Sequence, residues 1–160
     1  MLTNPIAADP VANVRRALTA AGARDTVTVL PGAVPTAAAA ADALGCDVAA
    51  ITNSLVFEVD GTPLLILASG AAKVDVRLVA SQLGTGRIRR AAPDFVLHYT
   101  GQEVGGVAPV GHPAKIRTLL DASLEEHLTL WAGAGDHHSM FSISYGELQR
   151  ITDAHALRVR

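Results

Sequence analysis

The chain has 160 residues, 49% of them hydrophobic and 18% charged, and a formal net charge of −2 at pH 7. This length is typical of one domain with its own core, and the composition excludes an intrinsically disordered chain. The overall charge does not indicate a nucleic-acid-binding protein, and no stretch approaches the roughly 20 consecutive apolar residues of a membrane-spanning helix.

The single cysteine and the N-terminal sequence indicate the cellular compartment of the protein. Cys46 is the single cysteine, so no internal disulfide can form, which favours a reducing, cytoplasmic environment. The first ten residues lack a basic region followed by an apolar run, so we expect no signal peptide.

In chain order, the apolar pattern predicts helices and strands that alternate without a strict repeat. Helices are expected where a capping residue precedes an amphipathic or alanine-rich run and glycine or a turn follows it, at residues 10–21, 37–44, 76–83, 93–99 and 145–151. Strands are expected at residues 26–30, 49–59, 63–68, 87–91, 116–120, 129–132 and 140–143, with a helical turn at 123–127.

The two longest apolar runs are joined by Asp60-Gly61, which is a hairpin signal. Both runs are almost continuously apolar, so we expect this hairpin to be central and covered on both faces. No linker or internal repeat divides the chain. The expected fold is therefore α+β, a single domain over residues 1–160 with a mixed, strongly curved β-sheet flanked by helices.

The segment from Thr100 to Pro113 has neither helical nor strand periodicity, yet it is not polar like a surface linker. It contains four of the 14 glycines and two of the eight prolines. Glycine lets backbone N–H groups approach a ligand closely, and proline restricts the chain around it. Such a loop suits amides aimed at an anion or a polarised carbonyl, although composition alone favours a tight, half-buried connection between two strands.

Basic residues concentrate between Lys73 and Arg117, where seven Lys or Arg residues face three acids. A one-sided basic patch beside the glycine-rich segment would suit contact with phosphates. A solvated surface of mixed charge remains an alternative for any of these residues.

Histidine and aspartate are potential metal ligands, most of them in one turn. They are His112, Asp136, His137 and His138. Because no recognised zinc-binding spacing is present, we predict no metal site and no cofactor. A polar turn is the alternative interpretation of residues 136–139. If His137 and His138 lie on a strand, their side chains point to opposite faces, so at most one enters a site.

Three stretches together resemble one known family. They are N-S-L-V-F at residues 53–57, the glycine-rich segment, and W-A-G-A-G at residues 131–135. In this order and spacing they resemble the YbaK family of aminoacyl-tRNA-synthetase-associated editing domains, over residues 27–148. The resemblance implies a deacylase that acts in trans on the ester of mischarged tRNA, with a small amino acid on a tRNA(Pro)-like tRNA. It also implies aminoacyl-tRNA, and a prolyl-tRNA synthetase, as partners.

The resemblance also implies roles for individual residues. Gly105 and Pro109 match the family's G-x-x-x-P loop, while Asn53 stands where many members have a lysine important for editing. The implied catalytic residues are Asn53, Gly105 and Gly106. The implied substrate-binding residues are Ser54, Val107, Ala108, Pro109, Gly135, Asp136, His137 and His138. The expected tRNA-binding residues are Lys73, Arg77, Arg87, Arg89 and Arg90. Because asparagine lacks the charge of lysine, the alternative is a non-catalytic binder of tRNA ends or small ligands.

Overall fold

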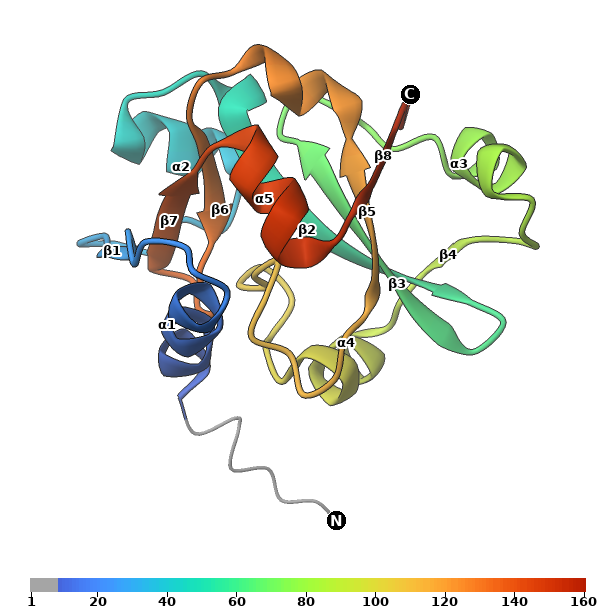
Figure 1. Cartoon of the computed structure of the whole chain (residues 1–160), viewed down its shortest axis with the longest axis horizontal. Helices are drawn as coiled ribbons and strands as arrows, with labels where there is room; N and C mark the ends of the chain where they lie inside the picture. The colour runs from blue at the N-terminus through green and yellow to red at the C-terminus, as the bar shows by residue number, and fades with distance from the viewer. Residues whose placement is uncertain (1–8) are drawn as a thin grey trace.

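The computed structural model describes residues 9–160, so most of the N-terminal stretch judged to lack a signal peptide lies outside the described residues. In the described part, five α-helices surround a mixed, open sheet of eight strands (Figure 1). The sheet combines antiparallel and parallel pairs, which confirms the predicted α+β class.

Four of the five helices described in residues 9–160 begin after a side chain that caps them, and the remaining one, α4 (Pro93–Thr100), begins with a proline. The other helices are α1 (Pro10–Ala20), α2 (Ala37–Leu44), α3 (Val76–Leu83) and α5 (Tyr145–Thr152). The Asp9 carboxylate accepts a hydrogen bond from the Ala12 N–H of α1, and the Ser144 hydroxyl accepts one from the Glu147 N–H of α5. Side-chain oxygens at such positions satisfy N–H groups that have no partner inside the helix. All five predicted helices are confirmed to within a residue or so at each end.

The strands lie in the order β1-β7-β6-β2-β3-β5-β8, and β4 pairs with β2 outside this path. They are β1 (Thr28–Val29), β2 (Ile51–Val59), β3 (Thr62–Ser69), β4 (Arg89–Arg90), β5 (Arg117–Asp121), β6 (Leu130–Gly133), β7 (Ser139–Ile143) and β8 (His155–Leu157). The sequence did not predict β8, because three residues are too few to show a period.

Two predicted strands are shorter than expected and one begins later. β1 and β4 contain two residues each, where five were predicted in each case. The prediction that Ala49 and Ala50 begin the long strand is wrong, because they lie in the 3-10 helix η2 (Val48–Ala50). The Asp47 carboxylate accepts a hydrogen bond from the Ala49 N–H at 2.9 Å and so caps that turn.

The hairpin of β2 and β3 lies in the middle of the sheet, as predicted, and turns at Asp60 and Gly61, both with positive φ. Hydrophobic clusters cover both faces. One joins Val56 and Leu65 to Val96 of α4 and Leu148 of α5. The other joins Ile66 and Phe57 of the hairpin to α3.

The ladder on the other side of β2 is interrupted. β6 pairs with Ile51 and Thr52, whereas β4 pairs with Phe57 and Glu58. Residues 53–56 lie between these two pairings and face no strand there among the described residues. In this interval the structure gives one backbone bond, from the Ala91 N–H to the Val56 carbonyl at 3.3 Å. The sheet therefore contains a gap beside its central hairpin.

Candidate active site

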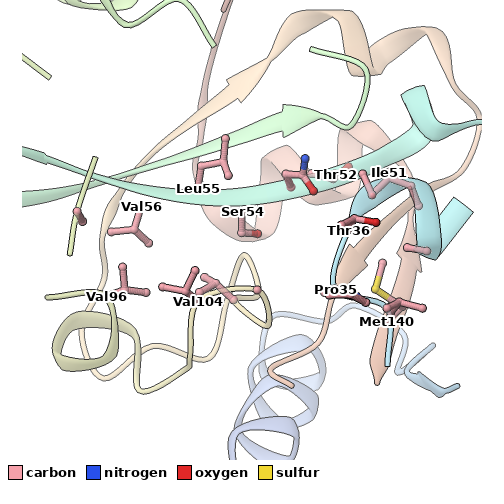
Figure 2. Close-up of a pocket in the computed structure, with 18 of the residues that line it drawn as sticks. Pro35, Thr36, Ile51, Thr52, Ser54, Leu55, Val56, Val96, Val104 and Met140 are labelled. Carbon is pink, nitrogen blue, oxygen red and sulfur yellow. The ribbon is translucent and has the colours of Figure 1, made fainter. Parts of the chain in front are cut away.

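A cavity of about 300 Å³ occupies the gap beside β2. Its wall is formed by β2 together with residues before and on α2, the region of β4 and α4, and the glycine-rich segment (Figure 2). The lining residues are Val34, Pro35, Thr36, Ala37, Ala40, Ile51, Thr52, Asn53, Ser54, Leu55, Val56, Phe57, Arg90, Ala91, Val96, Val104, Gly105, Val107, Gly133 and Met140. This volume is at the lower end of the range for small-molecule sites, roughly 300–1,000 Å³.

Successive side chains of β2 reach the cavity from opposite faces of the sheet, because side chains alternate along a strand. Val56 packs with Val96 and Val107, whereas Phe57 packs on the α3 side. Figure 2 shows Ser54 and Val56 directed toward Val96 and Val104. Alternation puts Asn53 on the same face as Phe57. Asn53 and the glycine-rich segment therefore border one cavity from different sides.

Two hydroxyl groups in this wall have no hydrogen-bond partner in the described chain. They are Oγ1 of Thr52 and Oγ of Ser54, and both oxygens are buried. Thr52 as a residue is 2% exposed. Their spacing of two residues puts both side chains on the face of the sheet that carries the glycine-rich segment. A buried hydroxyl without a partner costs about 1–3 kcal/mol. This wall therefore offers hydrogen-bonding groups that the fold itself leaves unsatisfied.

Buried polar side chains hold the glycine-rich segment in shape. The Gln102 side chain, 1% exposed, accepts a hydrogen bond from the Ala108 N–H at 2.7 Å and donates one to the Val110 carbonyl at 3.2 Å. The Thr100 hydroxyl accepts from the Gln102 N–H at 3.0 Å. No role was predicted for Gln102 from the sequence. A glutamine inside a segment otherwise rich in glycine and small apolar residues was the available signal.

The backbone amides of this segment divide into engaged and available groups. The Gly106 N–H donates to the Glu103 carbonyl at 2.9 Å, and the Ala108 N–H is held by Gln102. The Gly105 and Val107 amides have no partner among the described residues, and both residues line the cavity. The amides of Gly105 and Val107 therefore remain for a ligand.

The turn at residues 135–138 braces this loop without lining the cavity. A Cβ added at Gly106 would lie 2.9 Å from the carbonyl carbon of Asp136, so this close approach requires glycine. A Cβ added at Gly105 would lie 3.6 Å from Nε2 of His137. The Asp136 carboxylate accepts hydrogen bonds from the N–H groups of His138 and Ser139, both at 2.9 Å.

Because residues 135–138 form a bend between β6 and β7, the idea that His137 and His138 alternate along a strand does not apply. None of Gly135, Asp136, His137 and His138 lines the cavity wall. Within residues 9–160, no three His, Cys, Asp or Glu side chains gather in a geometry that could hold a metal ion.

Helix α1 supports both loops from behind. A Cβ added at Gly135 would lie 3.0 Å from the backbone carbon of Pro10, and one at Gly111 would lie 3.1 Å from the Cα of Val14. Val14 and Leu18 are fully buried and pack in one cluster with Ala108 and other residues near the loop.

Ala108 and Pro109 lie away from the cavity. Ala108 is fully buried, and Pro109 lines a second hollow on the far side of the segment, beside His112. The Nε2–H of His112 donates to the Ala108 carbonyl at 2.8 Å, and burial lowers the pKa of the imidazole below its usual value of 6.5.

The predicted tRNA-binding residues are all exposed, and they are Lys73, Arg77, Arg87, Arg89 and Arg90. Arg90 lines the cavity at its β4 end and is the one ionisable residue in the wall among residues 9–160. Arg89 lies 3.5 Å from the Glu58 carboxylate. An exposed pair of this kind contributes little to stability.

Comparisons with known proteins agree with this architecture. Residues 31–151 match the family model of the aminoacyl-tRNA editing domain. The protein YwhH of Bacillus subtilis (strain 168) is 30% identical over 141 residues, which cover 88% of this chain and 89% of YwhH. A proline–tRNA ligase of Citrifermentans bemidjiense is 31% identical over 97 residues, which cover 59% of this chain and 17% of the ligase.

Among solved structures, a candidate trans-editing enzyme for prolyl tRNA synthetase matches with a TM-score of 0.87 at 31% identity, over 99% of both chains. None of the helices in residues 9–160 has the length and apolar character needed to cross a bilayer.

Proposed function

Because the chain belongs to the family of aminoacyl-tRNA editing domains, we propose that it is an aminoacyl-tRNA deacylase that acts in trans on mischarged tRNA. The observation that carries this proposal is the cavity in the sheet gap, where the free amides of Gly105 and Val107 meet the edge of β2. The substrate we propose is a small amino acid on a tRNA(Pro)-like tRNA. A prolyl-tRNA synthetase would be a functional partner in the cytoplasm, where tRNA is charged.

The proposed reaction makes modest demands on the protein. Water attacks the carbonyl carbon of the aminoacyl ester, the bond to the ribose oxygen breaks, and the amino acid and the tRNA hydroxyl are released. The ester is already activated, and the neighbouring ribose hydroxyl can take part in proton transfer. The protein then has to position the ester, stabilise the oxyanion and limit the size of the acyl group. A cavity of about 300 Å³ suits a small acyl group.

We assign the site residues on the same basis. The amides of Gly105 and Val107 are the proposed oxyanion donors, and Asn53 is a secondary donor that reaches the ester from the other side of the gap. Gly106 and the turn at residues 135–138 hold the loop in place. Arg90 contacts a phosphate near the 3′ end, with Lys73, Arg77, Arg87 and Arg89 further out along the acceptor stem.

A second candidate function is binding of tRNA ends or small ligands without turnover. One observation favours it: among the described residues, the cavity wall contains neither a carboxylate nor a histidine, and Asn53 supplies no charge where the resemblance implies a lysine. This protein would protect or present an acylated end instead of hydrolysing it.

Single-turnover hydrolysis of a panel of purified mischarged tRNAs separates the two functions. Wild type should exceed the spontaneous rate for at least one small amino acid. Asn53→Ala should reduce that rate by an amount equivalent to about 1–3 kcal/mol, as expected for one hydrogen-bonding partner. Asn53→Lys should preserve or raise the rate, because a cation then lies near the developing oxyanion.

Wild-type rates equal to the spontaneous rate across the panel would reject the enzyme and leave the binder. Activity abolished by Asn53→Ala would instead give asparagine a primary catalytic role. Binding of tRNA should weaken as salt rises, because phosphate contacts release counterions. Affinity that is flat with salt, and unchanged after charge reversal at Arg89 and Arg90, would remove tRNA as the ligand.

A further inference from the structure

The two unpartnered hydroxyls lie beside aliphatic side chains of the cavity wall. Val56, Val96 and Val107 pack together on the face of the sheet toward which Thr52 and Ser54 point. The nearest backbone ladder ends at Thr52, which pairs with Ala132 of β6. Neither hydroxyl caps a helix or bonds to a neighbouring carbonyl in the described chain, in contrast to Thr118, whose hydroxyl donates to the Ile116 carbonyl at 2.8 Å.

The two ends of the cavity differ in charge. Arg90 lies opposite Phe57, at the β4 end, whereas Thr52 lies at the β6 end. Five residues of extended strand separate these ends, which is roughly 16 Å. A nucleotide phosphate held by Arg90 would therefore leave the acyl group near Ser54 and Thr52, among small aliphatic side chains.

Hydroxyl groups in such a wall discriminate between acyl side chains. An alanyl side chain would leave both oxygens buried without a partner. A seryl side chain of almost the same size supplies one hydroxyl that can donate and accept. A site built to hydrogen-bond a substrate hydroxyl rejects the analogue that lacks it far more strongly than an aliphatic pocket rejects an extra methylene.

We propose that Thr52 and Ser54 form a specificity-determining pair that selects an acyl group with a small, hydroxyl-bearing side chain, so that a seryl ester is preferred over an alanyl ester. This inference rests on the proposed function, because it concerns the acyl group of the same substrate. Both residues act by binding the side chain of the acyl group.

The experiment compares single-turnover hydrolysis of one tRNA(Pro) charged with serine or with alanine. Wild type should hydrolyse the seryl ester at least about tenfold faster. In the double variant Thr52→Val with Ser54→Ala the ratio of the two rates should fall close to one. Thr118→Val, which removes a buried hydroxyl that already has a partner, is the matched control and should leave the ratio at its wild-type value.

A second measurement uses non-hydrolysable adenosine analogues that carry a 3′-seryl-amide or a 3′-alanyl-amide, with binding to the full chain followed by calorimetry. Tighter binding of the seryl analogue, lost in the double variant, supports the pair even if neither ester is hydrolysed. Preferential binding of the seryl analogue without hydrolysis of either ester would reject the deacylase and retain the inference. Hydrolysis of both esters at a ratio that the double variant does not change would overturn the inference and retain the deacylase. Absence of both hydrolysis and analogue preference would overturn both.

Discussion

The two strands of the central hairpin pair with each other but differ in their outer neighbours and in their roles. β3 pairs with β2 on one side and β5 on the other, and Leu65, Ile66 and Leu67 in it are fully buried. β2 is equally well paired to β3, but its other side is open at residues 53–56, and this interval begins with the polar residues Asn53 and Ser54, directly after Thr52. Polar residues in the middle of an apolar strand thus coincide with the place where the ladder is broken. The hairpin contributes stability through β3 and a site through β2.

The largest expected effect is on stability and tests the role of β3. Leu65→Ala in β3 should lower the free energy of unfolding by about 2–5 kcal/mol, because it leaves a cavity in a fully packed core. Leu55→Ala in β2 is the matched change, and it should be less destabilising because Leu55 is half-buried and already borders the cavity. Urea denaturation measures both, and equal losses would contradict the division of roles between the two strands.

The next effect concerns the loop that faces the open side of β2. Gly106→Ala should destabilise the protein by about 1–3 kcal/mol, because the new methyl group collides with the backbone of Asp136. It should also reduce deacylation by displacing the adjoining amides. Gly146→Ala in α5 is the control, since nothing lies within 4 Å of its added Cβ. This control should be stabilising by about 0.5–1 kcal/mol. A fully stable Gly106→Ala protein would mean that the loop can move away from the turn.

Two smaller changes in the free energy of unfolding should have opposite signs. Thr52→Val removes an unsatisfied buried hydroxyl from β2 and should raise the free energy of unfolding by up to about 1 kcal/mol. Thr118→Val in β5 deprives the Ile116 carbonyl of its donor and should lower it by about 1 kcal/mol. Thermal or chemical denaturation of both variants provides the comparison. Destabilisation by Thr52→Val would show that its hydroxyl contributes to the fold as that of Thr118 does.

The smallest effect depends on pH and tests the far side of the glycine-rich segment. Burial lowers the pKa of His112, so the unfolded chain takes up a proton more readily than the native protein. The stabilising contribution is therefore complete above about pH 6.5 and declines below it toward the lowered pKa, by less than about 1 kcal/mol at pH 6.

His112→Gln, which retains a donor for the Ala108 carbonyl, should flatten this dependence between pH 7 and pH 6. Parallel pH profiles for wild type and His112→Gln would show that the His112 imidazole does not titrate differently in the two states.

Local signals in the sequence were sufficient for most of the fold. Asp9, Thr36 and Ser144 cap helices as their positions indicated, and Asp60-Gly61 forms the turn of the hairpin. β8 and the short forms of β1 and β4 could not be predicted, because their pairing depends on partners far away in the chain. Leu119 of β5 meets His155 of β8, for example, and no local period records that contact.

The site was only partly accessible to sequence reasoning. The motif at residues 53–57 and the glycine-rich segment border one cavity, and Arg90, which was expected from its charge to bind tRNA, also lines it. Alternation along β2, which separates Asn53 from Ser54, becomes informative only when the packing on each face is known. Likewise, the missing partner of Thr52 is a property of the folded chain, because any threonine in the sequence has the same hydroxyl.

The packing of helix α1 determines how short a fragment of this chain can be and still keep the site intact. The family match begins at residue 31, but Pro10 and Val14 of α1 are in van der Waals reach of Gly135 and Gly111, the glycines that flank the two loops. A fragment trimmed to the matched residues would expose the apolar backs of both loops to water. The boundary of the family match is therefore not the boundary of the functional module, which has to include a helix that contributes no residue to the cavity.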